Sequence, residues 1–209
     1  MTRIHRITIA AATLLLVAGC KKTSDNTSNY KSAINAYYSA HPTCLFSHPQ
    51  QFPTQVAASD TTKNAPFAAL VDQGLLTRST SEKKVVILSM QEINYDLSDK
   101  GRSDWTADQN QPGYGNFCFG KREASSIDNS TPNNGQPGAT TVVNYHYTFT
   151  GEPSWVKAAE IQNAFPRVQD ALAGNGTATS TLVDTPNGWQ VQPSGDSDSN
   201  SPADGRIVQ

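Results

Sequence analysis

The nine residues VVNYHYTFT, at positions 142–150, alternate between two kinds of side chain. One face of an extended chain would carry Val143, Tyr145, Tyr147 and Phe149, and the other would carry Val142, Asn144, His146 and Thr148. A period of two residues is typical of a strand in an antiparallel sheet with one face on a core. The stretch therefore predicts a half-buried strand, whose aromatic face is either core or a ligand-binding face.

The residues after this strand predict a helix and a hairpin. Pro153 and Ser154 open a helical stretch, which Pro166 kinks or ends because proline cannot continue a helix. Its apolar face would comprise Trp155, Ala158, Ile161 and Phe165. Further on, residues 181–183 and 189–191 flank a turn signal centred on Asn187-Gly188. The tail at 192–209 is rich in Ser, Asp, Pro and Gly, and we expect it to be disordered.

The residues before the strand predict two more helices. The first covers residues 28–40 and ends at His41-Pro42, because a residue before proline avoids the helical region. Its apolar stripe would be Tyr30, Ala33, Ile34 and Tyr37. The second covers residues 65–73, with Asn64 as its cap, Pro66 in its first turn and Gly74 as its end.

Two further strands and two loops complete the expected elements. The β-branched run at 85–87 predicts a strand over 83–90, and the residues around Cys118 predict one over 116–123. The intervening segments, 106–116 and 128–139, have the Gly, Pro and Asn content of loops. Helices and strands in this order predict the α+β class, with an antiparallel sheet, a helix and a hairpin in the second half.

The chain begins with a basic segment and a short apolar run. Arg3, His5 and Arg6 precede residues 7–18, a run that is too short to span a membrane but suits a secretory signal peptide. Val17-Ala18-Gly19-Cys20 then resembles the lipobox of bacterial lipoproteins. The resemblance implies cleavage before Cys20 and a diacylglycerol and further acyl chain on that residue. The alternatives are an ordinary signal peptide with a chance cysteine, or a buried helix.

The lipobox resemblance also implies a location. Residues 1–19 would be removed, and residues 20–29, which lack apolar side chains after the cysteine, would form a lipidated tether. Lys21 in place of aspartate implies the outer membrane, with the protein facing the periplasm. Removing residues 1–19 leaves 14 basic and 18 acidic residues, so the mature chain offers no general attraction to nucleic acid.

Residues 64–102 resemble the winged helix-turn-helix regulators. The resemblance lies in FAALVDQGLLTR (67–78) and YDLSDKGR (95–102), and it implies a recognition helix followed by a hairpin wing. However, the candidate helix, PFAALVDQ (66–73), has no Lys or Arg and carries Asp72. DNA-reading helices use basic and amide side chains. We therefore expect a winged-helix-like region at 30–105 that does not bind DNA, and a second α+β region at 106–191 that contains the aromatic-faced strand.

Once Cys20 is assigned to the lipid, two cysteines remain. In an oxidising envelope, Cys44 and Cys118 predict a disulfide that closes a loop of about 75 residues, the alternative being two buried thiols. His41, Cys44 and His48 have spacings that suit a metal site, with His146 as the remaining mature-chain histidine. Because the disulfide would use Cys44, we expect no metal and no cofactor.

Other catalytic or ion-binding motifs are weak. The segment from Asp196 to Asn200 begins like a calcium loop, but Ser201 and Ile207 replace the required Gly and Glu. The carboxylates of Glu152 and Glu160 are candidates for a dispersed catalytic pair, with exposed helix-end acids as the ordinary alternative. The sequence thus favours an envelope lipoprotein with a non-catalytic binding or scaffolding role, whose partners are membrane lipid and an envelope protein. The alternative is an envelope hydrolase with a dispersed active site.

Overall fold

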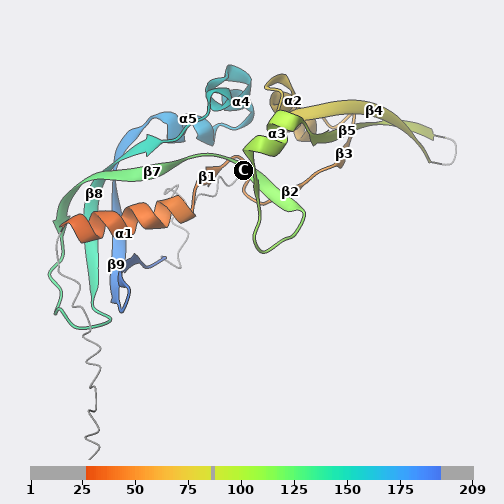
Figure 1. Ribbon diagram of the computed structural model, residues 1–209. Helices are drawn as coiled ribbons and strands as arrows, with labels where there is room; N and C mark the ends of the chain where they lie inside the picture. The colour runs from red at the N-terminus through yellow and green to blue at the C-terminus, as the bar shows by residue number, and fades with distance from the viewer. Residues whose placement is uncertain (1–26, 86–87, 194–209) are drawn as a thin grey trace, which may run out of the picture.

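The computed structural model describes residues 27–85 and 88–193 of the 209-residue chain, and it shows a mixed α+β fold dominated by antiparallel strands (Figure 1). The expected signal peptide, Cys20, the calcium-like segment and most of the expected tail lie outside these residues. The strands form two sheets, one with the order β1-β7-β8-β9-β10 and a smaller one with the order β3-β5-β4. Within the described residues, no helix has the length and apolar character needed to cross a membrane.

The aromatic strand is confirmed as β8 (Thr140–Thr150) in the centre of the large sheet. It pairs with β7 (Tyr114–Ser130) on one side and β9 (Asn175–Thr185) on the other, both antiparallel. Val143 and Tyr145 are fully buried, whereas Val142 and His146 on the opposite face are exposed. The expected strand at 116–123 is also present, but β7 extends beyond both of its ends. The expected loops at 106–116 and 128–139 are correspondingly shorter.

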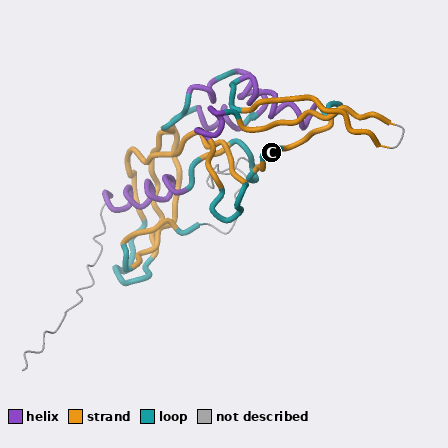
Figure 2. The backbone as a smooth tube through the Cα atoms, turned by 45° about the vertical axis from the view of Figure 1, so that its right-hand side comes forward, coloured by secondary structure: helices purple, strands orange, loops and turns teal. Residues whose placement is uncertain are grey.

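Helix α1 (Thr27–Ala40) lies across one face of the large sheet (Figures 1 and 2). It therefore begins inside the segment expected to be a tether. Its buried residues confirm Tyr30, Ala33 and Ile34, but Tyr38 is buried in place of the expected Tyr37. Positions 30, 34 and 38 are four residues apart, so they share one face of the helix. These residues pack with buried residues of the sheet, namely Ala124, Val143, Tyr145, Leu182 and Trp189.

Helix α2 (Thr61–Asp72) begins four residues before the expected start. Asp60 is the N-cap, because its carboxylate accepts a hydrogen bond from the backbone N–H of Lys63 at 3.0 Å. The expected cap, Asn64, is instead a buried residue within the helix, and Pro66 lies in the helix interior. Gly74 ends this segment as expected, with a positive φ of 70°.

The expected strand at 83–90 is wrong, because that stretch is the distal end of a hairpin. Strands β4 (Leu76–Val85) and β5 (Leu88–Leu97) pair antiparallel from Leu76↔Leu97 to Val85↔Leu88, so the expected single strand is divided between two paired strands. The β-branched composition that favours a strand interior does not report where two strands turn. The short strand β3 (Thr54–Ala57) adds to the other edge of β5.

The remaining elements join the two sheets. Helix α3 (Asp99–Asp104) leads to β6 (Trp105–Ala107), which pairs with β7, as do β1 (Thr43–Cys44) and β2 (Gln50–Gln51). The expected single helix after β8 is three short ones, η1 (Ser154–Lys157), α4 (Ala159–Ala164) and α5 (Arg167–Leu172), with Pro166 as the N-cap residue of α5. Strand β10 (Gly188–Val191) closes the expected hairpin with β9, and its turn residues are 186 and 187.

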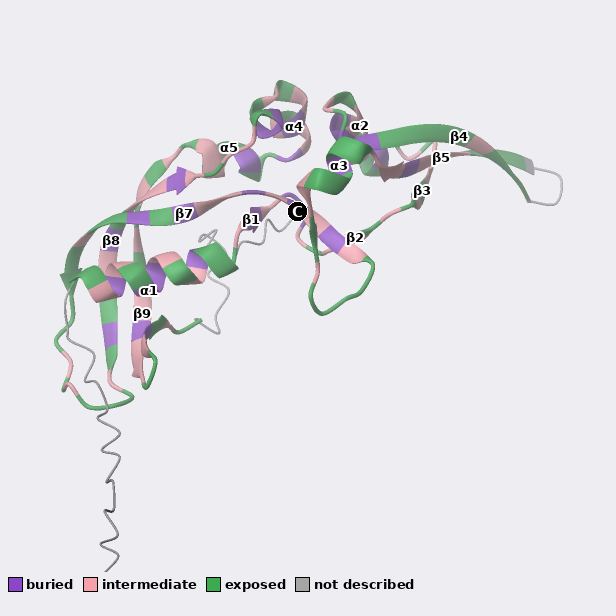
Figure 3. Ribbon diagram, in the orientation of Figure 1, coloured by how far each residue is buried: buried purple, intermediate pink, exposed green. Residues whose placement is uncertain are grey.

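Two hydrophobic clusters share strand β7. Phe117 and Phe119 belong to the cluster that includes α2, β5 and α4, whereas Ala124 belongs to the cluster under α1. The expected boundary at 105/106 therefore does not separate two cores, because α1 packs on the second-half sheet and β7 reaches the first-half elements. Figure 3 shows buried segments along the shared strand β7, and it shows the β4–β5 hairpin as largely exposed.

Candidate functional site

The cysteines of the expected disulfide are bonded to each other. Cys44 on β1 and Cys118 on β7 occupy directly opposite positions in the antiparallel pair. Leu45, Phe117 and Phe119 beside them are fully buried, so the bond lies at the edge of the first hydrophobic cluster. The disulfide fastens β1, which follows α1, to the strand shared by both clusters. The lipidation of Cys20 stays a prediction.

The structure does not bring the candidate metal ligands together. The ring of His41 stacks on Tyr37, with centroids 4.2 Å apart, and its Nδ1 lies 2.8 Å from the Tyr37 carbonyl oxygen. His146 Nε2 lies 3.2 Å from Asp128 Oδ1 on the exposed face of the sheet. Cys44 is consumed by the disulfide, and His48 is exposed. Within residues 27–85 and 88–193, no three His, Cys, Asp or Glu side chains are grouped so as to hold a metal ion.

The two carboxylates considered for catalysis occupy the region around α4. Glu160 on α4 accepts a hydrogen bond from the side-chain amide of Gln73 at the end of α2. This contact ties two packed helices together, which is a structural role. Glu152 lies in the loop before η1 and is half-buried.

The groups with shifted pKa values serve the core and a helix cap. Burial raises the pKa of Tyr145 well above its usual value, and its hydroxyl lies 3.1 Å from that of Tyr38. Burial also raises the pKa of Tyr95, which donates a hydrogen bond to Asn64 Oδ1 at 2.9 Å. The backbone N–H of Lys63 lowers the pKa of Asp60, the cap of α2. Each of these shifts has a structural explanation.

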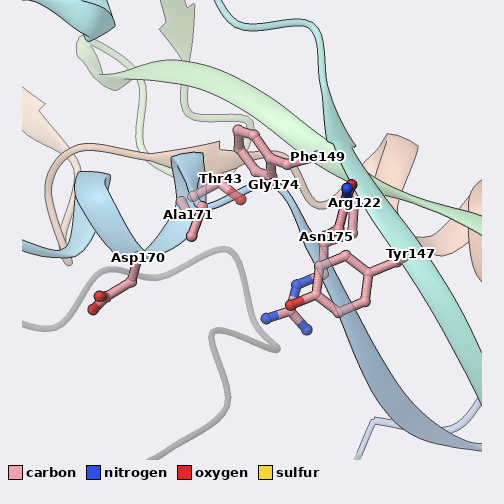
Figure 4. A pocket seen from close by; sticks show the side chains of 9 residues that line it. Thr43, Arg122, Tyr147, Phe149, Asp170, Ala171, Gly174 and Asn175 are labelled. Atoms are coloured by element: carbon pink, nitrogen blue, oxygen red, sulfur yellow. The ribbon is translucent and has the colours of Figure 1, made fainter.

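A small open hollow of about 40 Å³ lies where β1, β7, β8 and the α5–β9 connection meet (Figure 4). Its lining comprises Thr43, Arg122, Tyr147, Phe149, Asp170, Ala171, Ala173, Gly174 and Asn175. The sequence singles out two of these residues, Tyr147 and Phe149, as part of the aromatic face of the strand. Arg122 stands between Lys121 and Glu123 in a locally polar run, and no sequence pattern marked it. No motif marks such a site, since its residues come from four separate segments of the chain.

Arg122 is the distinctive residue of this hollow. It is only 7% exposed, and its guanidinium carbon lies 4.4 Å from the ring centroid of Tyr147 and 5.9 Å from that of Tyr38. Figure 4 shows the guanidinium beside the Tyr147 ring, with the Asp170 carboxylate turned away from it. The ion pairs and hydrogen bonds of the described part of the chain do not include this guanidinium. The hollow therefore contains a buried charge held by aromatic contacts.

The second distinctive feature is the distal part of the β4–β5 hairpin. The third strand of its sheet ends at the pair Ala57↔Glu92, whereas the hairpin continues to Val85↔Leu88. Figure 1 shows this two-stranded segment extending away from the rest of the molecule. The side chains described in this segment are all exposed, namely Glu82, Lys83, Lys84, Ser89, Met90 and Gln91. Among the described residues, Met90, at 47%, is the most exposed of the large apolar side chains.

Comparisons with protein-family models, with curated proteins and with solved structures find no match for this chain.

Proposed function

We propose that this protein is a lipid-anchored, non-catalytic binding or scaffolding protein of the bacterial cell envelope, and that the β4–β5 hairpin contacts its protein partner. The observation that carries this proposal is the hairpin itself. Its distal part extends past the third strand of the sheet, and none of the side chains described there, at 82–84 and 89–91, belongs to either hydrophobic cluster. Ordering an arm whose described side chains lie outside the core has a cost in conformational entropy, so a role outside the fold explains its length.

The segment from β3 to β5 supports the proposal of a winged-helix-like unit. Strand β3, helix α2 and the β4–β5 hairpin follow one another, and the sheet order β3-β5-β4 places the first strand beside the last. The hairpin would be the wing of this unit. We propose that the unit serves protein contact, because an extracytoplasmic location gives it no access to the chromosome.

The chemistry of α2 supports a role other than DNA binding. Its one basic side chain, Lys63, forms an ion pair with Asp60 at 3.2 Å, and Asp72 is exposed near its end. The opposite end of the helix is packed on α4 through Gln73 and Glu160. A helix without free basic residues cannot neutralise phosphates. A gel-shift experiment with random duplex DNA at low salt should therefore show no complex, and a salt-sensitive complex would contradict this part of the proposal.

The partner role of the hairpin can be tested by shortening it. Residues 82–91 are replaced by Asn-Gly, which forms a two-residue turn between the directly opposed Ser81 and Glu92. The core residues of β5, Ile93 and Tyr95, stay in place, so the thermal midpoint should change little. A photo-crosslinking residue in place of Met90 of the full chain should give one discrete adduct in the native envelope. Addition of the purified full chain should reduce the yield of this adduct, whereas addition of the shortened chain should not.

The matched control is the same crosslinker at Val142. Val142 is a large apolar side chain that is 36% exposed, and it lies on the large sheet, away from the hairpin. Crosslinking there should give no discrete adduct. Equal adducts from positions 90 and 142, or competition by the shortened chain, would refute the assignment of the hairpin.

The anchor is tested separately by mass spectrometry of the protein isolated from its native membrane. The proposal expects an N-terminal peptide that begins at Cys20 and carries diacylglycerol and a further acyl chain. Replacing Cys20 with serine should abolish both the added mass and the partition into detergent. An uncut chain with an unmodified Cys20 would exclude the lipoprotein assignment and leave the hairpin experiment unaffected.

A further inference from the structure

Arg122 is a largely buried arginine for which the described residues provide no ion-pair partner. It lies on β7 opposite Phe149 of β8, and it is 93% buried. Arginine keeps its charge at physiological pH and has five N–H donors and no acceptor. Tyr147 and Tyr38 contact it through their rings, which attract a cation but accept none of its hydrogen bonds in this arrangement. The guanidinium thus reaches the hollow with its donors unused by the described residues.

Neighbouring residues hold the guanidinium of Arg122 in position. Tyr147 lies across Gly176, its direct partner on β9, and a Cβ atom at position 176 would be 2.8 Å from the tyrosine hydroxyl oxygen. The missing side chain at 176 is therefore what allows Tyr147 to lie flat against β9. The ring of Tyr147 in turn supports one face of Arg122 at 4.4 Å. A guanidinium held in this way is ordered before any ligand arrives, which lowers the entropic cost of binding.

Of the charged groups around the hollow, the guanidinium of Arg122 is the one that faces into it. Asp170 on α5 is exposed at the rim and is turned away from the guanidinium in Figure 4. Lys121, the neighbour on β7, donates its hydrogen bond to Ser39 of α1 at 2.8 Å. Thr43 is buried, and its hydroxyl points toward the hollow in Figure 4. The inner wall therefore offers a cation and a hydroxyl, which are groups that bind an anion.

We propose that this hollow binds one carboxylate group, inserted end-on against the guanidinium of Arg122. A water-sized group needs roughly 10–15 Å³ of such space, so about 40 Å³ accommodates about three heavy atoms, the size of a carboxylate. The planar fork of arginine matches the two oxygens of a carboxylate. The rest of the ligand, such as a peptide that ends in a free carboxylate, would remain outside the open side of the hollow. A bound carboxylate would supply the counter-ion and the hydrogen-bond acceptors that the described residues do not provide to this guanidinium.

The decisive experiment compares acetyl-glycyl-glycine with its C-terminal amide, which has the same shape without the charge. Isothermal titration calorimetry of the full detergent-solubilised protein should show saturable binding of the acid, with a Kd on the order of 1 mM for a single charge-assisted pair. The amide should bind at least about tenfold more weakly. This comparison requires no variant. Equal binding of the acid and the amide, both to the full chain and to a chain that ends at residue 193, would overturn the proposal.

Variants locate the binding. Arg122→Gln should abolish the preference for the acid, and Arg122→Lys, which keeps the charge without the fork, should reduce it. The matched control is Arg167→Gln, an exposed arginine at the start of α5, the helix that also carries the rim residue Asp170; this change should leave the Kd unchanged. A loss of binding in the Arg167 variant as large as in the Arg122 variant would show that general charge attraction, and not this hollow, accounts for the affinity.

The carboxylate has two possible sources, a separate ligand or the acidic residues at 194–209 of the same chain. A chain ending at residue 193 distinguishes them. If the tail occupies the hollow, the acid peptide binds only after the tail is removed; if the ligand is separate, it binds both chains equally. Either result supports a carboxylate site at Arg122. Absence of acid-specific binding in both chains refutes it.

Discussion

Removing the Cys44–Cys118 disulfide tests how this fold is stabilised. The two cysteines are 74 residues apart in sequence, so the bond closes a loop of about 75 residues in the unfolded chain. That loop contains α2, the whole small sheet and the beginning of β7. The chain-entropy model gives about 4.5 kcal/mol for its closure. A domain of this size commonly has about 5–15 kcal/mol in total, so the bond supplies a large part of the stability.

The perturbation is the double variant Cys44→Ala, Cys118→Ala, compared with the oxidised protein by urea unfolding. The free energy of unfolding should fall by about 3–4.5 kcal/mol, since measured losses often fall below the model value. The dependence on urea should also steepen, because an unbridged unfolded chain exposes more surface. Addition of a reductant should reproduce both effects in the original chain and should have no effect on the double variant.

A loss below about 1 kcal/mol with unchanged urea dependence would refute the reasoning, because it would show that the bond does not restrict the unfolded chain. A second check is direct. Peptide mass spectrometry of denatured, unreduced protein treated with a thiol reagent should find positions 44 and 118 unlabelled. Labelling at both would mean that the bond is absent in solution.

Three further predictions follow from the packing of single residues. Asn64→Ala should destabilise the protein by about 2–3 kcal/mol in urea unfolding, because it removes the hydrogen bond to the Ala57 carbonyl and leaves the hydroxyl of the buried Tyr95 without its acceptor; full stability in the variant would contradict the hydrogen-bond assignment. Gly120→Ala should lower the free energy of unfolding by about 2 kcal/mol or more, since φ is 147° and a Cβ atom would lie 2.6 Å from the ring of Phe149. The control Gly138→Ala, with φ of 82° and open space around the Cβ position, should lower it by about 1 kcal/mol. Equal losses in the two variants would count against the steric explanation. Burial raises the folded-state pKa of Tyr145 and Tyr95, so their contribution to stability is complete below pH 10, the usual tyrosine value, and is lost as the pH rises above it. Unfolding measured from pH 8 to 11.5 should show this decline, and a flat profile would exclude buried neutral tyrosines.

The central strand and the first helix could be predicted from sequence because their signals are local. The alternation in VVNYHYTFT places Val143 and Tyr145 on one face whatever lies opposite, and the structure buries that face. The helix at 28–40 likewise shows its apolar stripe without reference to the sheet. The turn signal at Asn187-Gly188 predicted the β9–β10 hairpin to within one residue. The disulfide was predictable because only two cysteines remained once Cys20 was assigned to lipid.

Tertiary structure decided the burial of the polar residues and the limits of the small sheet. Asn64 suits a helix cap by sequence, but Asp60 caps the helix, while the Asn64 side chain bonds Ala57, Asp60 and Tyr95. Val85 belongs to a strand-like run, yet its strand ends there because the pairing of β4 with β5 sets the position of the turn. Sequence patterns describe neighbours along the chain, whereas these outcomes depend on partners that are distant in sequence.

Arg122 shows this difference most clearly. By sequence it is one charged residue between two others, a pattern typical of an exposed strand edge. Its burial is decided by Tyr38 from α1 and Tyr147 from β8, which are separated from it by 84 and 25 positions. The sequence by itself determined which strands have an apolar face, since that property repeats every second residue. Only the folded chain determined which charge is enclosed, because enclosure requires side chains from α1, β8 and β9 to meet around it.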